Sequence, residues 1–170
     1  MQSGTLRVAA WIVERVAVLL RASLAFATVA MLACISYQVL MRYVFSKSPA
    51  WSEELALLMF SWGILGGMAL GVHEGFHVRI DLLVEQVSAT LKAWAERFIG
   101  IATALFGAYL AWSGWRFVEF TSGSVSAAIG YPIEYLHSLP PVSGALMFLF
   151  AIWRLIAGPP AADVRTDSET

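Results

Sequence analysis

The stretch LALLMFSWGILGGMALGV, residues 55–72, runs for 18 positions without a charged residue. A helix that crosses the hydrocarbon core of a bilayer needs about 20 predominantly apolar residues. This stretch and its flanks therefore predict a membrane span over about residues 52–73. Three further charge-free stretches predict spans over about 17–41, 98–116 and 135–155. We expect an all-α membrane protein with four transmembrane helices.

The composition supports this class and excludes others. Of the 170 residues, 59% are hydrophobic and 14% are charged, and the mean hydropathy is +0.70. The lipid bilayer is therefore the expected surrounding. A net charge of −1 gives no basic stripe that could neutralise phosphates, which excludes a nucleic-acid partner. The single cysteine, Cys34, allows no intrachain disulfide and is expected to act as a small buried hydrophobe.

Between the second and third spans, residues 80–96 change their pattern. Apolar and polar side chains fall on opposite sides of a predicted helix, which is typical of a helix lying flat in the membrane interface. The apolar side consists of Ile80, Leu83, Val84, Val87, Leu91 and Trp94, and the polar side of Asp81, Glu85, Gln86, Ser88, Lys92 and Glu96.

Basic residues are distributed unequally between the two sides of the predicted membrane. The positive-inside rule places the richer side in the cytoplasm. This puts both termini and the flat helix in the cytoplasm. Separately, we expect residues 1–157 to form one transmembrane domain and residues 158–170 a disordered tail. The richer side holds Arg7, Arg15, Arg21, Arg79, Lys92, Arg97, Arg154 and Arg165, and the other side Arg42, Lys47 and Arg116.

Small residues recur on two spans at the spacing of helix contact faces, since helices in lipid associate through close packing. The second span has Gly63, Gly67 and Gly71, with Gly66 beside them. The third has Gly100, Ala104, Gly107, Ala111 and Gly114 at steps of four and three. We expect this third-span seam to meet another helix at short range, either within the chain or on another membrane protein.

The pentapeptide HEGFH, residues 73–77, matches the His-Glu-x-x-His pattern of zinc proteases. Such a site needs both histidines on one continuous helix and a third ligand, for which Asp81, Glu85 and His137 are the candidates. Gly75 stands between the histidines where the span is expected to end. An integral-membrane zinc metalloprotease is thus the alternative function.

No charged residue falls in the middle of any span, and the three histidines lie at span ends. A transporter that works alone should carry an ionisable group or broken helix near the midplane. We therefore expect neither a self-contained transporter, nor an enzyme, nor a cofactor-binding protein.

The segment from Ser48 to Leu83 contains an ordered set of motifs: Trp51, Glu53-Glu54, Trp62, a glycine-bearing span, and Glu74-Gly75-x-His77-x-Arg79-x-Asp81. In these motifs it resembles the small membrane subunit, of the DctQ type, of tripartite ATP-independent periplasmic (TRAP) transporters. Looser agreement in YQVLMRYVF, residues 37–45, and in the glycine-tyrosine-proline run at 130–132 extends the resemblance over about 150 residues.

The resemblance implies a non-catalytic partner of a large membrane permease subunit in the bacterial inner membrane. A periplasmic substrate-binding protein would deliver a small organic acid, a carboxylate, and a sodium or proton gradient would drive uptake. The family tends to have a basic residue at the position of His73, so the zinc pattern is read as accidental. The loop 117–133 aligns with nothing, and its contacts stay unassigned.

Two specific contacts are predicted beside the resemblance. Glu54 and Arg42 should pair at the outer ends of the first two spans, because each is otherwise a lone charge near hydrocarbon. His77, Arg79 and Asp81 should anchor the turn into the flat helix, with Asp81 near its N-terminus, where a carboxylate favours the helix dipole. The alternative for Arg42 and Glu54 is that both merely face water or headgroups. The alternative for His77, Arg79 and Asp81 is that they are ordinary solvated loop residues.

Overall fold

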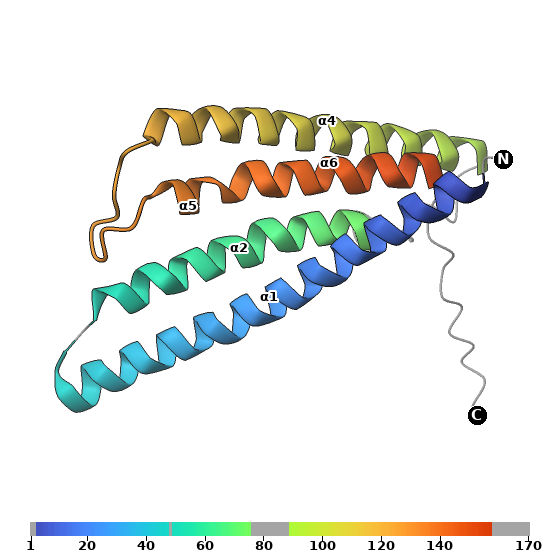
Figure 1. Ribbon diagram of the computed structural model, residues 1–170. Coiled ribbons are helices and arrows are strands. Elements are labelled where there is room, and N and C mark those ends of the chain that lie inside the picture. Colours follow the sequence, from blue (N-terminus) through green and yellow to red (C-terminus); the bar gives the residue numbers. More distant parts are fainter. Residues whose placement is uncertain (1–2, 48, 76–88, 158–170) are drawn as a thin grey trace, which may run out of the picture.

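The structure is a computed structural model that describes residues 3–47, 49–75 and 89–157. These residues form four long helices and one short one (Figure 1). All four long helices are long and apolar enough to cross a membrane, so the prediction of a multi-pass membrane protein with four spans is confirmed. The helices are α1 (Ser3–Phe45), α2 (Ala50–Glu74), α4 (Ala89–Thr121), α5 (Glu134–His137) and α6 (Leu139–Ala157).

The long helices lie side by side in the order α4, α6, α2, α1, and α1 runs obliquely along α2 (Figure 1). Over most of their length, helices in such a row have two neighbours at most, so their broad faces stay uncovered. Only 17% to 33% of each apolar window is buried within the chain. Lipid or another membrane protein must cover the rest, because water cannot.

The row has two ends. The terminal end holds the start of α1, the end of α2, the start of α4 and the end of α6 (Figure 1). The opposite end, which holds the other terminus of each of these helices, is called the hairpin end. The buried apolar cluster brings all four long helices together toward the terminal end, around Phe150, which has no exposed surface. Its other members are Val13, Ala17, Leu20, Ala69, Val72, Ala104, Met147 and Ala151.

Helix α1 is longer than the span predicted from the sequence. Its 43 residues extend about 65 Å at 1.5 Å per residue, roughly twice the hydrocarbon thickness. The charges at Arg7, Glu14 and Arg15 do not end it, since charged residues are good helix formers. Val13 and Ala17 in this first part are buried in the cluster, which ties it to the fold.

The prediction of a separate flat helix over 80–96 meets a different arrangement where the structure describes it. Residues 89–96 are the first turns of α4 and continue without a break into the third span. The charges of Glu96 and Arg97 mark a hydropathy boundary, but neither glycine nor proline interrupts the backbone there. The remaining predicted residues, 80–88, and the tail, 158–170, lie outside the described ranges.

Candidate functional site

The seam predicted on the third span contacts α6. A Cβ added at Gly107 would lie 2.8 Å from the Phe148 nitrogen and 2.9 Å from the Gly144 oxygen. From the other side, a Cβ added at Gly144 would lie 2.5 Å from the Ala111 nitrogen. Both backbones therefore meet at a distance that only glycine permits. The expectation of a short-range contact is confirmed, and its partner is within the chain.

The rest of the seam follows the same line. A Cβ at Gly100 would meet Leu155 at 2.7 Å, and one at Gly114 would meet Pro141 at the same distance. Ala104, between them, is 5% exposed. Five small residues spaced along α4 thus fit the length of α6, and this pair is the tightest unit of the row.

The glycines of α2 divide differently from the prediction. Among the described residues, a Cβ added at Gly63 or Gly67 would meet nothing within 4 Å, so these two glycines face open space there. The internal contact is made by Gly66, where a Cβ would meet Leu24 of α1 at 2.9 Å. Gly71 accepts a hydrogen bond from the Gly75 nitrogen at the end of the helix. The Gly63–Gly67 face is therefore left for lipid or a partner.

At the hairpin end, Glu54 in the second turn of α2 binds the loop that joins α4 to α5. Its carboxylate accepts hydrogen bonds from the Ser126 hydroxyl at 2.7 Å and from the backbone nitrogens of Ala128 at 2.8 Å and Ile129 at 3.3 Å. Burial, with a smaller contribution from the Glu54 charge, raises the pKa of Tyr131 in this loop. The phenol therefore stays neutral beside the carboxylate.

The predicted ion pair between Arg42 and Glu54 is wrong for this structure. Among the described residues, the salt bridges do not include Arg42, which lies exposed in the last turn of α1. The loop amides satisfy the Glu54 carboxylate instead. The sequence could not indicate that Glu54 binds the loop, because the loop contains no basic residue that would suggest an ion pair.

The other residues of the Trp51 motif have distinct places. Trp51 packs its ring against Tyr37 of α1 at a centroid distance of 5.4 Å, and Glu53 is exposed. Trp62 donates a hydrogen bond to the Ser23 hydroxyl at 3.2 Å and packs against the buried cluster. The two tryptophans thus join α2 to α1 along its length.

At the terminal end, α2 finishes in a polar cluster. Glu74 accepts a hydrogen bond from the Arg21 side chain at 2.8 Å, and His73 lies 3.3 Å from the Glu14 carboxylate. Arg154 of α6 donates to the Val72 carbonyl at 3.0 Å, which satisfies one of the free carbonyls of the last turn. Helices α1, α2 and α6 are therefore bound together here by charge as well as by packing.

The geometry bears directly on the zinc pattern. Helix α2 ends at Glu74, and Gly75 follows with φ of 79°, the left-handed conformation of a helix C-terminus. His73 and Glu74 therefore do not lie on a helix that continues through His77, and Glu74 is engaged by Arg21. His77, Arg79 and Asp81, with the turn they were predicted to anchor, fall outside the described residues.

A prediction follows for Glu74. Glu74→Gln should lower the free energy of unfolding by no more than about 1 kcal/mol, because the pair with Arg21 is partly exposed. It should remove no peptidase activity, and metal analysis of the purified protein should find no stoichiometric zinc. Tightly bound zinc at one per chain, lost in this variant, would restore the protease hypothesis.

Several contact residues were missed from the sequence. Gly144 and Ser143 belong to a short small-residue run in the fourth span that a search for contact faces could have found. Ser143 is fully buried and donates its hydroxyl to the Leu65 carbonyl of α2 at 2.5 Å. Arg154 and Ser126 gave no such signal. Arg154 binds the backbone carbonyl of Val72 and Ser126 binds Glu54, and both partners are distant in sequence.

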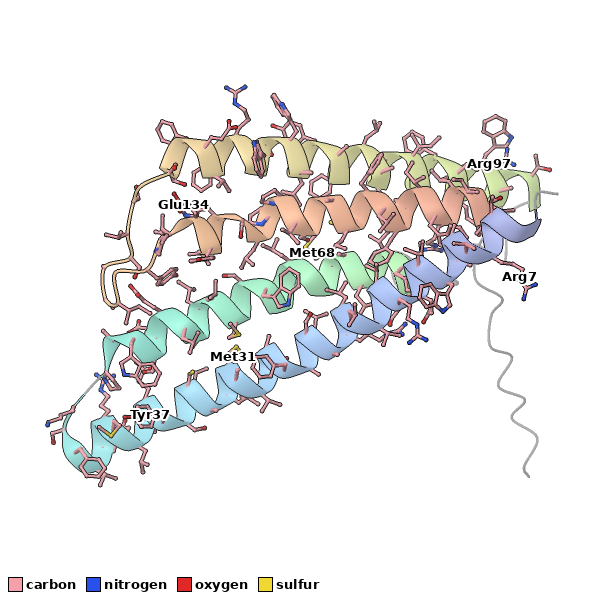
Figure 2. All side chains as sticks on the ribbon, in the orientation of Figure 1. Arg7, Met31, Tyr37, Met68, Arg97 and Glu134 are labelled. Carbon is pink, nitrogen blue, oxygen red and sulfur yellow. The ribbon has the colours of Figure 1, made fainter. Side chains whose placement is uncertain are left out.

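Figure 2 shows how charge and apolar bulk are distributed along the row. Arg7 and Arg97 lie at the terminal end and Glu134 toward the hairpin end, whereas Met31 and Met68 lie between. The middles of the helices, residues 22–41, 55–72, 98–115 and 139–153, hold no Asp, Glu, Lys, Arg or His. A solute site in the middle of the membrane would therefore find no acidic or basic side chain on these helices.

The chain matches a known family over most of its length. Residues 31–158, about three quarters of the chain, match the family described as "Tripartite ATP-independent periplasmic transporters, DctQ component". The chain belongs to the DctQ component family. This confirms the resemblance seen in the Trp51 and Glu74 motifs and makes the chain a small permease component of a transporter.

Individual relatives agree with the DctQ assignment. The chain is 37% identical over 54 residues, 32% of its length, to the C4-dicarboxylate TRAP transporter small permease protein DctQ of Vibrio cholerae. It is 31% identical over 100 residues, 57% of its length, to the protein of that name from Rhodobacter capsulatus. The matches span 23% and 44% of these two relatives.

A third relative is a larger protein. The chain is 27% identical over 110 residues, 65% of its length, to the sialic acid TRAP transporter permease protein SiaT of Haemophilus influenzae. The matched segment is 18% of that relative. A segment similar to this DctQ component is therefore part of a much longer permease polypeptide.

Proposed function

We propose that this DctQ component is the non-catalytic small subunit that braces a large permease subunit during ion-gradient-driven uptake. The cargo is a small organic acid, a carboxylate, delivered by a periplasmic substrate-binding protein. The observation that carries this proposal is the single row of apolar helices, which leaves broad faces uncovered and holds no charged group in its middle. Such a chain can support a transporter, but the middles of its spans offer no charged side chain that could bind an anion.

The relatives support the partner and the class of cargo. Two of them are named for C4-dicarboxylates and a third for sialic acid, all of which carry carboxylates. The third relative is one long permease polypeptide that contains a segment similar to this chain. That segment and the rest of the permease must therefore lie in the same membrane. The family description, ATP-independent, favours an ion gradient as the energy source.

The orientation also belongs to this proposal. The terminal end carries most of the basic residues, among them Arg7, Arg15 and Arg21 of α1, and Arg97 of α4. The positive-inside rule then sets both termini in the cytoplasm of a bacterial inner membrane. The hairpin end, with Glu54 and its loop, would face the periplasm.

We place the large permease subunit against the open glycines of α2. Gly63 and Gly67 have no neighbour in the described chain that explains their smallness, although close backbone approach is what such residues permit in lipid. Helix α2 lies inside the row, between α6 and α1, so a partner on this face would touch the centre of the subunit.

Gly67→Trp tests this placement. The bulky ring should hold the large subunit away, so that co-purification falls about tenfold or more and uptake falls with it, while the small subunit itself stays monodisperse. Val29→Trp is the matched control, because Val29 is an exposed residue, 67% accessible, in the middle of α1. Normal assembly and uptake in Gly67→Trp would place the interface elsewhere.

The proposed function itself is tested by deletion. Removing the gene for this chain should abolish uptake of the carboxylate while the binding protein still captures it in solution. If uptake continues unchanged, or if the wild-type chain never co-purifies with a large permease, the chain is not a bracing subunit.

A further inference from the structure

The Glu54 carboxylate occupies a site built for an anion by the loop between α4 and α5. One oxygen accepts from the Ala128 nitrogen, and the other accepts from the Ser126 hydroxyl and the Ile129 nitrogen. Successive backbone nitrogens that converge on one point form a concave anion site. Gly130, with φ of 67°, supplies the turn that follows these nitrogens.

The loop that carries this site has a defined shape. It doubles back on itself through hydrogen bonds from the Ser126 nitrogen to the Tyr131 oxygen at 2.9 Å and from the Ile133 nitrogen to the Ser124 oxygen at 3.1 Å. The Gly123 nitrogen donates to the Glu134 carboxylate at 2.8 Å. We call residues 122–133 the hairpin loop. Its own bonds hold it in shape, and Glu54 holds it to α2.

The contact between Glu54 and the hairpin loop lies at the end of the row opposite to the buried apolar cluster. The buried apolar cluster joins all four long helices near the terminal end, and the Ser143 bond joins α6 to the middle of α2. Toward the hairpin end, the loop leaves α4 and reaches the first turns of α2 (Figure 1). Ser52 and Ala56, one turn apart on α2, are buried, and Ser126 of the loop is 8% exposed.

We infer that Glu54 is a latch: it holds the hairpin loop on α2 and thereby fixes the separation of the α1–α2 pair from the α4–α6 pair at the hairpin end. The inference uses only contacts within this chain and is independent of the proposed function. Breaking the latch should let the two pairs move apart at the hairpin end while the cluster holds them at the terminal end. The chain would then pivot at the terminal end, and the Glu54 carboxylate would set the separation of the two helix pairs at the hairpin end.

Spin-label distances in the full-length chain, reconstituted in lipid nanodiscs, test the latch. Cys34→Ala removes the native thiol. One label pair joins Tyr43 of α1 to Phe120 of α4, exposed by 82% and 86%, and reports the separation of the helix pairs at the hairpin end. A reference pair joins Leu19 of α1 to Phe98 of α4, exposed by 70% and 73%, and reports the terminal end.

Glu54→Ala should broaden the Tyr43–Phe120 distance distribution about twofold or more, because the freed end samples several separations. The Leu19–Phe98 distribution should not change. Ser126→Ala removes one of the three bonds and should give an intermediate width. The matched control is Glu53→Ala, since Glu53 is the neighbouring carboxylate and is exposed, and it should leave both pairs as in the parent protein.

Two results would overturn the inference. An unchanged Tyr43–Phe120 distribution in Glu54→Ala would show that other contacts fix the hairpin end. Equal broadening of both label pairs would show that Glu54 supports the whole fold rather than one end. A loss of monodisperse protein in Glu54→Ala would count with the second result, and the milder Ser126→Ala variant would then be measured for the same pattern.

Discussion

Gly107→Leu is expected to abolish the folded state of this chain. Any side chain at this position starts with a Cβ 2.8 Å from the Phe148 nitrogen and 2.9 Å from the Gly144 oxygen. Both are backbone atoms of α6 and cannot rotate away as a flexible side chain could. Leucine would force α4 and α6 apart along their whole seam, and in lipid no hydrophobic gain compensates for the lost packing. The variant should reach the membrane but yield no monodisperse protein in detergent.

A milder substitution makes the same expectation quantitative. Gly107→Ala adds only the Cβ and should lower the free energy of unfolding by about 1–3 kcal/mol, the usual cost of overpacking. Gly67→Ala is the control, because its Cβ would meet no atom within 4 Å in the part of the chain that the structure describes. That variant should be neutral or stabilised by up to about 1 kcal/mol through helix propensity. Unfolding of both variants in one detergent decides, and equal stabilities would contradict the α4–α6 contact.

Phe150→Ala should have the second-largest effect among our predictions. Phe150 is fully buried where the four long helices meet, and its ring lies 4.8 Å from that of His73. In soluble proteins such a truncation costs about 3–5 kcal/mol, partly through transfer and partly through the cavity. The transfer part is weaker in lipid, whereas the lost dispersion contacts remain. We therefore expect a loss near the lower end, about 3 kcal/mol.

Phe148→Ala is the matched control for this prediction. It removes the same side chain from the same helix, but Phe148 is 43% exposed. Its loss of stability should be less than half that of Phe150→Ala in the same unfolding experiment. Similar losses for the two variants would mean that the cluster at the terminal end does not hold the row together.

Much of the architecture could be read from the sequence because the bilayer constrains it strongly. A charge-free run such as residues 55–72 must become a helix in hydrocarbon, where every backbone polar group needs an internal partner. The small-residue seam of α4 was visible for a similar reason, since close packing replaces the hydrophobic effect as the force between helices. The family could be recognised from motifs that are contiguous in the chain.

What the sequence left open depends on partners distant along the chain. It could not show that the seam of Gly107 belongs to α6 or that Gly66, and neither Gly63 nor Gly67, packs against α1. It paired Glu54 with Arg42 because opposite charges are the visible signal, whereas the structure pairs it with a hydroxyl and backbone nitrogens. Backbone donors look the same at every position of a sequence. Only the folded loop brings three donors to one point, and for this reason the tertiary structure alone decided what Glu54 does.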